Sequence, residues 1–143
     1  MHSLPIQTEQ EAAVAILFAS VLFRGQQLTQ AQIEHLSRML VLSARFQGHS
    51  LNDLTRKALT LQAEHGSKKL IEESAPFVDE EFKETLFAMA CEIMTADGKV
   101  DEEESEIIAM IAIYLGLSME TMKMILTTYM IRNRWNIKII ERE

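Results

Sequence analysis

The chain has 143 residues with a net charge of −7, and 48% of its residues are hydrophobic, which is typical of one globular domain with a buried core. The single cysteine, Cys91, excludes an internal disulfide framework, and five glycines and two prolines are too few for a turn-rich, multi-stranded fold. The longest stretches without charge, 12–23 and 107–119, are shorter than the ~20 residues that cross a bilayer, so we expect buried helices there.

The first half of the chain has the apolar periodicity of three helices. The first is apolar almost all round and ends at Arg24-Gly25. Thr29 and Gln32 form a capping-box pattern before the second, and Ser50 precedes the third. The expected helices are residues 9–23, 29–47 and 50–65, followed by a connector at 66–78 that holds a short helical turn. The core positions expected on the second and third helices are Ile33, Leu36, Leu40, Ala44, Leu51, Leu54, Ala58 and Leu61.

The second half repeats this pattern. Asp79 is placed to cap a helix, Asp101 and Glu104 form a second capping-box pattern, Gly116 is a helix stop and Ser118 a further cap. The expected helices are residues 79–96, 101–115 and 118–130, with Phe82, Leu86, Met89, Ala90 and Ile93 inward. The remaining residues 131–143 are basic and apolar, and include Trp135. They favour a packing helix, with contact to a membrane surface as the alternative.

Short sequence matches relate the two halves. LFAS at 17–20 corresponds to LFAM at 86–89, and GHSLNDL at 48–54 corresponds to GLSMETM at 116–122. The sequence therefore predicts an all-α single domain over 1–143, a bundle of about seven helices built from two pseudo-twofold-related three-helix repeats. Repeat one covers about 9–65, the connector 66–78, repeat two about 79–130, and a C-terminal segment 131–143.

The stretch ADGKVDEEE at 96–104 carries most of the negative charge. Six acids lie between Asp97 and Glu106 against Lys99, and residues 1–78 are balanced, with seven basic and seven acidic residues. Such a field repels nucleic acid and attracts cations or basic partners. An EF-hand loop with Gly98 at its sixth position would place Ile93 at the first, where a side-chain oxygen is needed. An ordinary EF-hand is therefore excluded.

Two other interpretations of this stretch remain. One is structural, with a tight turn at Asp97-Gly98 and a capped helix start. The first repeat makes the corresponding turn without any carboxylate, so helix geometry does not require the acids, and crowding them costs stability. The other interpretation is therefore a site for Ca²⁺, Mg²⁺ or Mn²⁺, which prefer oxygen ligands. The expected metal ligands are Asp97, Asp101 and Glu104, with Glu103 and Glu92 as further candidates.

Catalytic signatures are not found in the sequence. The four histidines have no metal-ligand spacing and are expected on the surface or in caps. Cys91 is expected to be a buried, inert thiol. No HExxH, GxSxG, P-loop or GxGxxG pattern occurs. We therefore expect no enzymatic activity and no organic cofactor.

The segment from about 82 to 126 resembles the TerB-like tellurite-resistance family. Its apolar helix, A-D-G-x-[VI] turn and following Glu match at Ala96, Asp97, Gly98, Val100 and Glu104. The N-terminal region of DjlA-type membrane co-chaperones has a similar motif. The resemblance implies a duplicated helical fold, metal binding at the acidic turn, and a role in tellurite or chemical stress in the cytoplasm or at the inner face of its membrane.

Two functions follow as hypotheses. The first is a non-enzymatic module that binds a divalent cation and docks partner proteins in a stress response. The second is a metal-independent, co-chaperone-like interaction domain that uses its acidic face. Both imply a protein partner rather than nucleic acid, and neither needs a transmembrane segment.

Overall fold

A computed structural model describes residues 4–24, 28–96 and 100–134 of the chain. These residues form helices and no strand, which confirms the predicted all-α class. The α-helices are α1 (Glu9–Leu22), α2 (Gln30–Leu42), α3 (Leu51–His65), α4 (Ser67–Ser74), α5 (Lys83–Met94), α6 (Glu102–Leu115) and α7 (Met119–Asn133). Three short 3-10 helices join them, η1 (Ala44–Phe46), η2 (Ala75–Phe77) and η3 (Glu80–Phe82).

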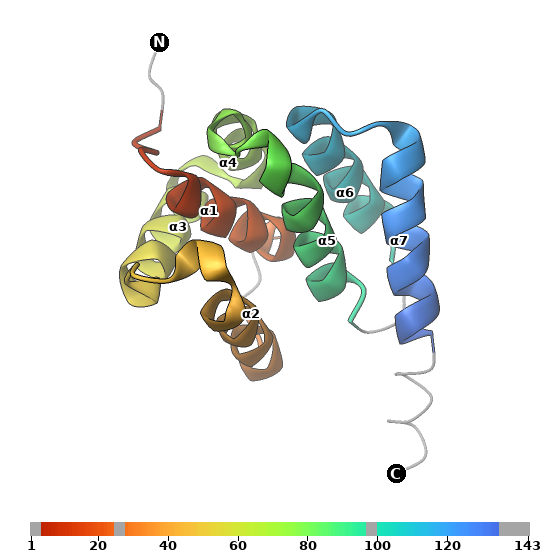
Figure 1. Cartoon of the computed structure of the whole chain (residues 1–143), viewed down its shortest axis with the longest axis horizontal. Helices are drawn as coiled ribbons and strands as arrows, with labels where there is room; N and C mark the ends of the chain where they lie inside the picture. Colours follow the sequence, from red (N-terminus) through yellow and green to blue (C-terminus); the bar gives the residue numbers. More distant parts are fainter. Residues whose placement is uncertain (1–3, 25–27, 97–99, 135–143) are drawn as a thin grey trace.

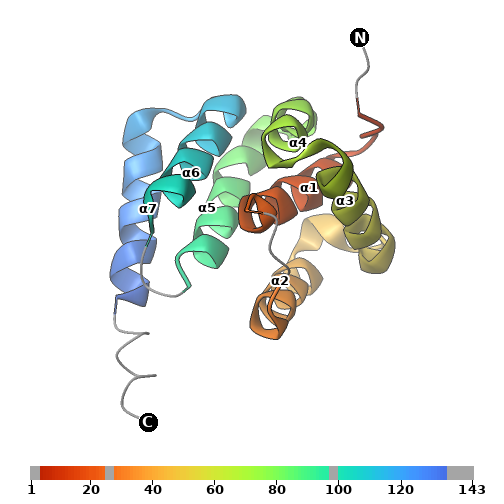
Figure 2. The same cartoon turned by 180° about the vertical axis from the view of Figure 1, so that it is seen from behind.

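Helix α1 lies at the centre of the molecule. Every residue from Ala12 to Leu22 is buried, as expected for a helix that is apolar all round. Figures 1 and 2 show α3 on one side of α1, α5 and α6 on the other, and α4 above it, and α1 contacts all four. Because α1 touches both halves of the chain, its burial joins them into one core.

Helix α2 ends earlier than the sequence predicts. It was expected to reach Gln47, but it stops at Leu42, and the backbone is extended at Ser43. Leaving the helix buries Phe46, whose ring packs edge-on against Phe82 with centroids 6.4 Å apart. Ile33, predicted to face the core, is 42% exposed, so Leu36 and Leu40 supply the buried residues of α2. Long-range packing of Phe46 thus overrides the helical periodicity.

The predicted connector contains more helix than expected. In place of a short helical turn, α4 spans Ser67–Ser74 and begins after Gly66, whose φ of +85° is a conformation that favours glycine. Leu70 and Ile71 are completely buried, and α4 packs along α1. The segment is therefore part of the core as well as a link between the halves.

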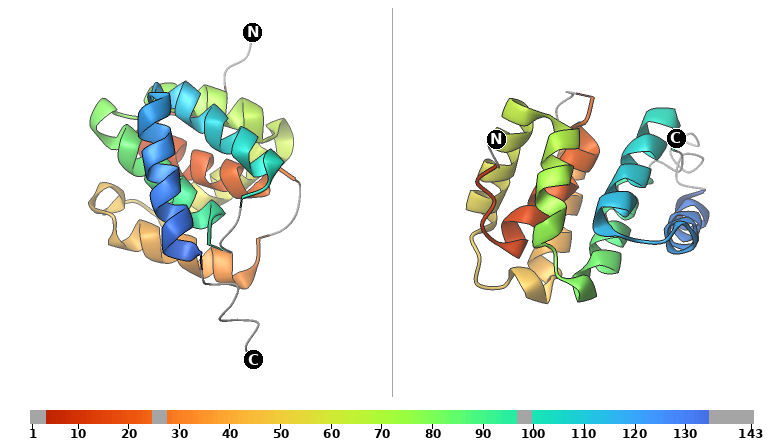
Figure 3. Two further views of the ribbon diagram at one scale, coloured as in Figure 1. Left: turned by 90° about the vertical axis from the view of Figure 1, so that its right-hand side faces the viewer. Right: turned by 90° about the horizontal axis from the view of Figure 1, so that it is seen from above.

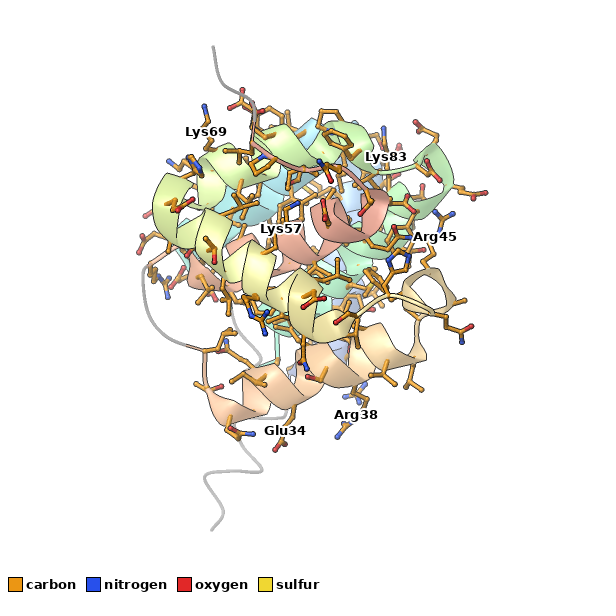
Figure 4. All side chains as sticks on the ribbon, turned by 90° about the vertical axis from the view of Figure 1, so that its left-hand side faces the viewer. Glu34, Arg38, Arg45, Lys57, Lys69 and Lys83 are labelled. Atoms are coloured by element: carbon orange, nitrogen blue, oxygen red, sulfur yellow. The ribbon has the colours of Figure 1, made fainter. Side chains whose placement is uncertain are left out.

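The start of the second half also differs from the prediction. Asp79 makes no side-chain cap, and α5 begins only at Lys83, after η3. The Asp79 carboxylate instead accepts a hydrogen bond from Arg45 at 3.2 Å, and its N–H donates to Glu9 at 2.7 Å. Figure 4 shows Arg45 beside the start of α1, where it also pairs with Glu9 at 2.6 Å. Asp79 therefore connects elements rather than capping one.

The remaining helices follow their sequence signals closely. Gly116 ends α6 with a φ of +76°, and the Ser118 hydroxyl accepts from the Thr121 N–H at 3.1 Å to cap α7. Helix α7 continues to Asn133, three residues past the predicted end at 130, because the buried Asn133 amide donates to Thr95 Oγ1 at 3.3 Å. Trp135 and the rest of the C-terminal segment lie outside the described residues. The twofold relation between the repeats, and the division into repeats and connector, stay predictions.

In the described part of the chain, no helix has the length and apolar character that crossing a membrane requires.

Candidate functional site

The acidic corner, defined here as Asp101, Glu103 and Glu104 at the start of α6, lies beside the end of α1. Arg24 follows α1 directly and reaches the corner from the opposite half of the chain. The turn residues 97–99, including the predicted ligand Asp97, lie outside the described residues. Val100 is half-buried and packs against the core.

Asp101 and Glu104 form the capping box that their spacing predicts. The Glu104 N–H donates to Asp101 Oδ1 at 2.8 Å, and the Asp101 N–H donates to Glu104 Oε1 at 2.9 Å. Thr29 and Gln32 form the corresponding box at the start of α2, with bonds of 3.0 and 3.1 Å. One oxygen of each carboxylate is therefore committed to the backbone, and the same local geometry exists in the first half without any charge.

Arg24 neutralises part of the acidic corner. Its guanidinium bonds to Asp101 Oδ2 through Nη2 and to Glu103 Oε1 through Nε, the latter at 3.3 Å. The hydrogen bond from the Glu104 N–H, with the nearby Arg24, lowers the pKa of Asp101 below its ordinary value. The bond to Asp101, together with the charges of Glu103 and Glu104, raises the pKa of Arg24. The corner thus already holds one cationic group.

Glu92 lies at a different place in the fold. Its Oε2 is 2.6 Å from His35 Nε2 of α2, and its Oε1 accepts from the Tyr129 hydroxyl of α7 at 3.4 Å. His35 was expected to be a surface or capping residue, and its link to Glu92 was missed because the two are far apart in sequence. Burial, together with the Glu92 charge, raises the pKa of Tyr129. Glu92 therefore connects α2, α5 and α7.

The described residues bring together no group of three or more His, Cys, Asp or Glu side chains with the spacing to hold a metal. The structure brings Asp101, Glu103 and Glu104 together around Arg24. Glu92 instead makes its hydrogen bonds with His35 and Tyr129. Because Asp97 is not described, the predicted ligand set stays a prediction. Arg24 was missed as a site residue, although it directly precedes Gly25, where the first repeat makes the turn that corresponds to the acidic turn.

A cavity of about 310 Å³ opens next to the acidic corner. It lies between the end of α1, the start of α2 and the end of α5, and its lining includes Glu104, Gln32 and Thr29. Cys91 does not contribute to this lining. It is a free, buried thiol, as predicted, and burial raises its pKa to about 12, which keeps it protonated and unreactive.

Comparison with known proteins gives the fold and the family. The chain resembles a protein of unknown function from Porphyromonas gingivalis W83, whose crystal structure superposes with a TM-score of 0.54 at 24% identity, over 91% of this chain and 96% of that one. At this identity the likeness shows a shared fold alone. No curated protein shows a significant match. The family model described as tellurite resistance protein TerB matches residues 11–126, which is well over half of the chain. The chain therefore belongs to the TerB family.

Proposed function

We propose that this chain is a non-enzymatic TerB module that binds a divalent cation at its acidic corner and docks a partner protein in a tellurite or chemical-stress response. The stress-response role and the cytoplasmic setting rest on family membership. The cation rests on the convergence of carboxylates at the corner, together with the predicted ligand Asp97.

One observation supports the cation in particular. Asp101 and Glu103 both direct a carboxylate oxygen to the same guanidinium, and Glu104 lies close enough to raise the pKa of that group. Side chains that converge on one positive group create a negative environment that also attracts a metal cation, and the predicted ligand Asp97 would be needed to complete a metal site there. Arg24 is then an internal competitor, whose guanidinium occupies the position that the cation would take.

The donor set fits hard cations. The corner offers carboxylate oxygens without sulfur or imidazole, which suits Ca²⁺, Mg²⁺ or Mn²⁺. Asp101 and Glu104 each commit one oxygen to the capping box, so a bound ion would keep several water ligands. Asp97 is the additional ligand that the sequence predicts.

The test is an amide NMR titration of metal-stripped protein with each ion. We expect saturable shifts or broadening within residues 92–106, weakened in Asp97→Asn and Glu104→Gln chains that keep the helical circular dichroism spectrum. In the Arg24→Gln chain the affinity is expected to rise several-fold, because the competing charge is gone. Arg38→Gln is the matched control, since Arg38 is exposed on α2 and makes no ion pair with the described residues. Absence of any shift at millimolar ion, in the wild-type and Arg24→Gln chains alike, would contradict the proposal.

A second function is favoured by the same arginine. Because Arg24 and the capping box already engage Asp101, Glu103 and Glu104, the corner needs no metal to be stable, and its remaining negative charge is available to a basic partner surface. A metal-independent interaction domain of this kind would bind its partner with a strong dependence on salt, and EDTA would leave the binding unchanged. Partner binding that EDTA abolishes would contradict it.

A further inference from the structure

The last turn of α7 is fixed beside the end of α5. The Asn133 side chain is buried, and its amide donates to Thr95 Oγ1 at 3.3 Å and to the Tyr129 carbonyl oxygen at 3.0 Å. Thr95 follows α5 directly and is completely buried. The chain beyond Arg134, residues 135–143, therefore leaves the described part of the fold at a fixed place, next to the end of α5.

This exit is level with the start of α2. Glu92 bonds to His35 of α2 and to Tyr129 of α7, so these two residues lie on either side of it. Figures 1 and 3 show that α2 starts and α7 ends at the same end of the molecule. Gln30 comes five residues before His35, and Arg134 comes five residues after Tyr129. With a rise of about 1.5 Å per residue, both lie about 7.5 Å further toward that end.

The cavity of about 310 Å³ lies at this end, because the start of α2 and the end of α5 form two of its walls. Met94 and Ala96 of the α5 wall stand directly before and after Thr95, to which α7 is anchored. Most of the lining is apolar, and the apolar lining residues are Val21, Phe23, Ala31, Ile93, Met94 and Ala96. The exit of the chain and a largely apolar cavity thus adjoin one another.

The residues that follow α7 are also largely apolar. Residues 135–140 read WNIKII, and four of these six are large and apolar, namely Trp135, Ile137, Ile139 and Ile140. Such a run gains free energy by leaving water. Lys138 is the one charge within it. The other charged residues of the C-terminal segment lie before or after the run, namely Arg132, Arg134, Glu141, Arg142 and Glu143.

The charges beside the cavity favour a lysine. Glu104 is the one charged side chain among the described residues that line the cavity. The acidic corner, which reaches the cavity through Glu104, has three carboxylates against the single guanidinium of Arg24. Asp97 and Lys99, which lie outside the described residues, together add no net charge. The corner therefore attracts Lys138.

We infer that residues 135–140 fold back over this end of the molecule and place their apolar side chains in the cavity between α1, α2 and α5, with Lys138 toward Glu104. Six extended residues span up to about 20 Å, which is ample because two residues of the cavity wall flank the anchor of α7. A segment tethered this closely has an effective concentration in the millimolar range, so it occupies the cavity ahead of a free partner of similar chemistry and lower concentration. The inference does not depend on cation binding, because apolar contacts carry it.

Trp135 is the only tryptophan of the chain, so its fluorescence reports on this segment directly. In the full chain we expect a blue-shifted emission maximum and a several-fold smaller acrylamide quenching constant than in a peptide of residues 131–143. Ala31→Arg places a bulky charge of the same sign as Lys138 in the cavity lining and should move both values toward those of the peptide. Ser37→Arg is the matched control, because Ser37 is exposed on the same helix and does not line this cavity. Peptide-like values in the wild-type chain, or values that Ala31→Arg leaves unchanged, would overturn the inference.

Cysteine pairing tests the place of docking in the full chain. A chain with Ala31→Cys and Ile137→Cys should form an intramolecular disulfide several-fold faster than a chain with Ser37→Cys and Ile137→Cys, while Cys91 stays buried. A rate that dilution leaves unchanged identifies the bond as intramolecular. Equal rates in the two chains would show that the segment has no preferred place on the fold and would contradict docking in the cavity.

Discussion

At the scale of single residues, helix starts in this protein depend on side chains that satisfy backbone N–H groups. Thr29 and Asp101 perform the same task in the two halves, each with a partner three residues later. They differ in charge, since the Asp101 carboxylate is ionised at neutral pH and has a lowered pKa in the folded chain. The two caps should therefore respond differently to acid.

Alanine at each cap, with urea unfolding measured between pH 2.5 and 7, checks this expectation. Thr29→Ala should lower the free energy of unfolding by about 0.5–2 kcal/mol at every pH. Asp101→Ala should also destabilise at neutral pH. Because the folded pKa of Asp101 lies below its unfolded value near 4, its stabilisation is complete above that value and is lost as the pH falls through the folded pKa. An Asp101→Ala effect that stays constant down to pH 2.5 would show that its charge contributes nothing.

At the scale of elements, α4 shows that the segment between the two halves belongs to the core. Leu70→Ala should lower the free energy of unfolding by about 2–5 kcal/mol, because it removes a completely buried side chain next to α1. Lys69→Ala is the control on the exposed side of the same helix and should change it by less than about 0.5 kcal/mol. Equal, small effects measured by urea unfolding would mean that residues 66–78 act as a connector alone.

At the scale of the whole molecule, Glu92 joins helices from both halves through His35 and Tyr129. Glu92→Ala should lower the free energy of unfolding by about 0.5–1.5 kcal/mol through the lost hydrogen bonds and leave the cation affinity unchanged. Glu84→Ala, exposed on the same helix, is the control for both measurements. A loss of cation affinity in the Glu92→Ala chain alone would indicate that Glu92 is a metal ligand. It would contradict the assignment of Glu92 as a link between helices.

The candidate site was predictable only in part. The capping box of Asp101 and Glu104 follows from residues three apart, so its prediction needed no knowledge of the fold. Arg24 lies 77 positions before Asp101, and His35 lies 57 positions before Glu92. No local pattern specifies which of many distant charged residues will meet. For this reason the sequence pattern favoured Glu92 as a metal ligand at the acidic turn and did not indicate its pairing with His35.

The sequence by itself determined the helical class, the family, the caps at Thr29, Ser50, Asp101 and Ser118, and the helix stop at Gly116. Each of these depends on periodicity, a short motif, or hydrogen bonds within one turn. Only the tertiary structure decided where α2 ends, that α4 is buried, and that Arg24 neutralises the acidic corner. These features depend on burial and charge pairing between segments distant in sequence, where the free energy of packing exceeds local preference.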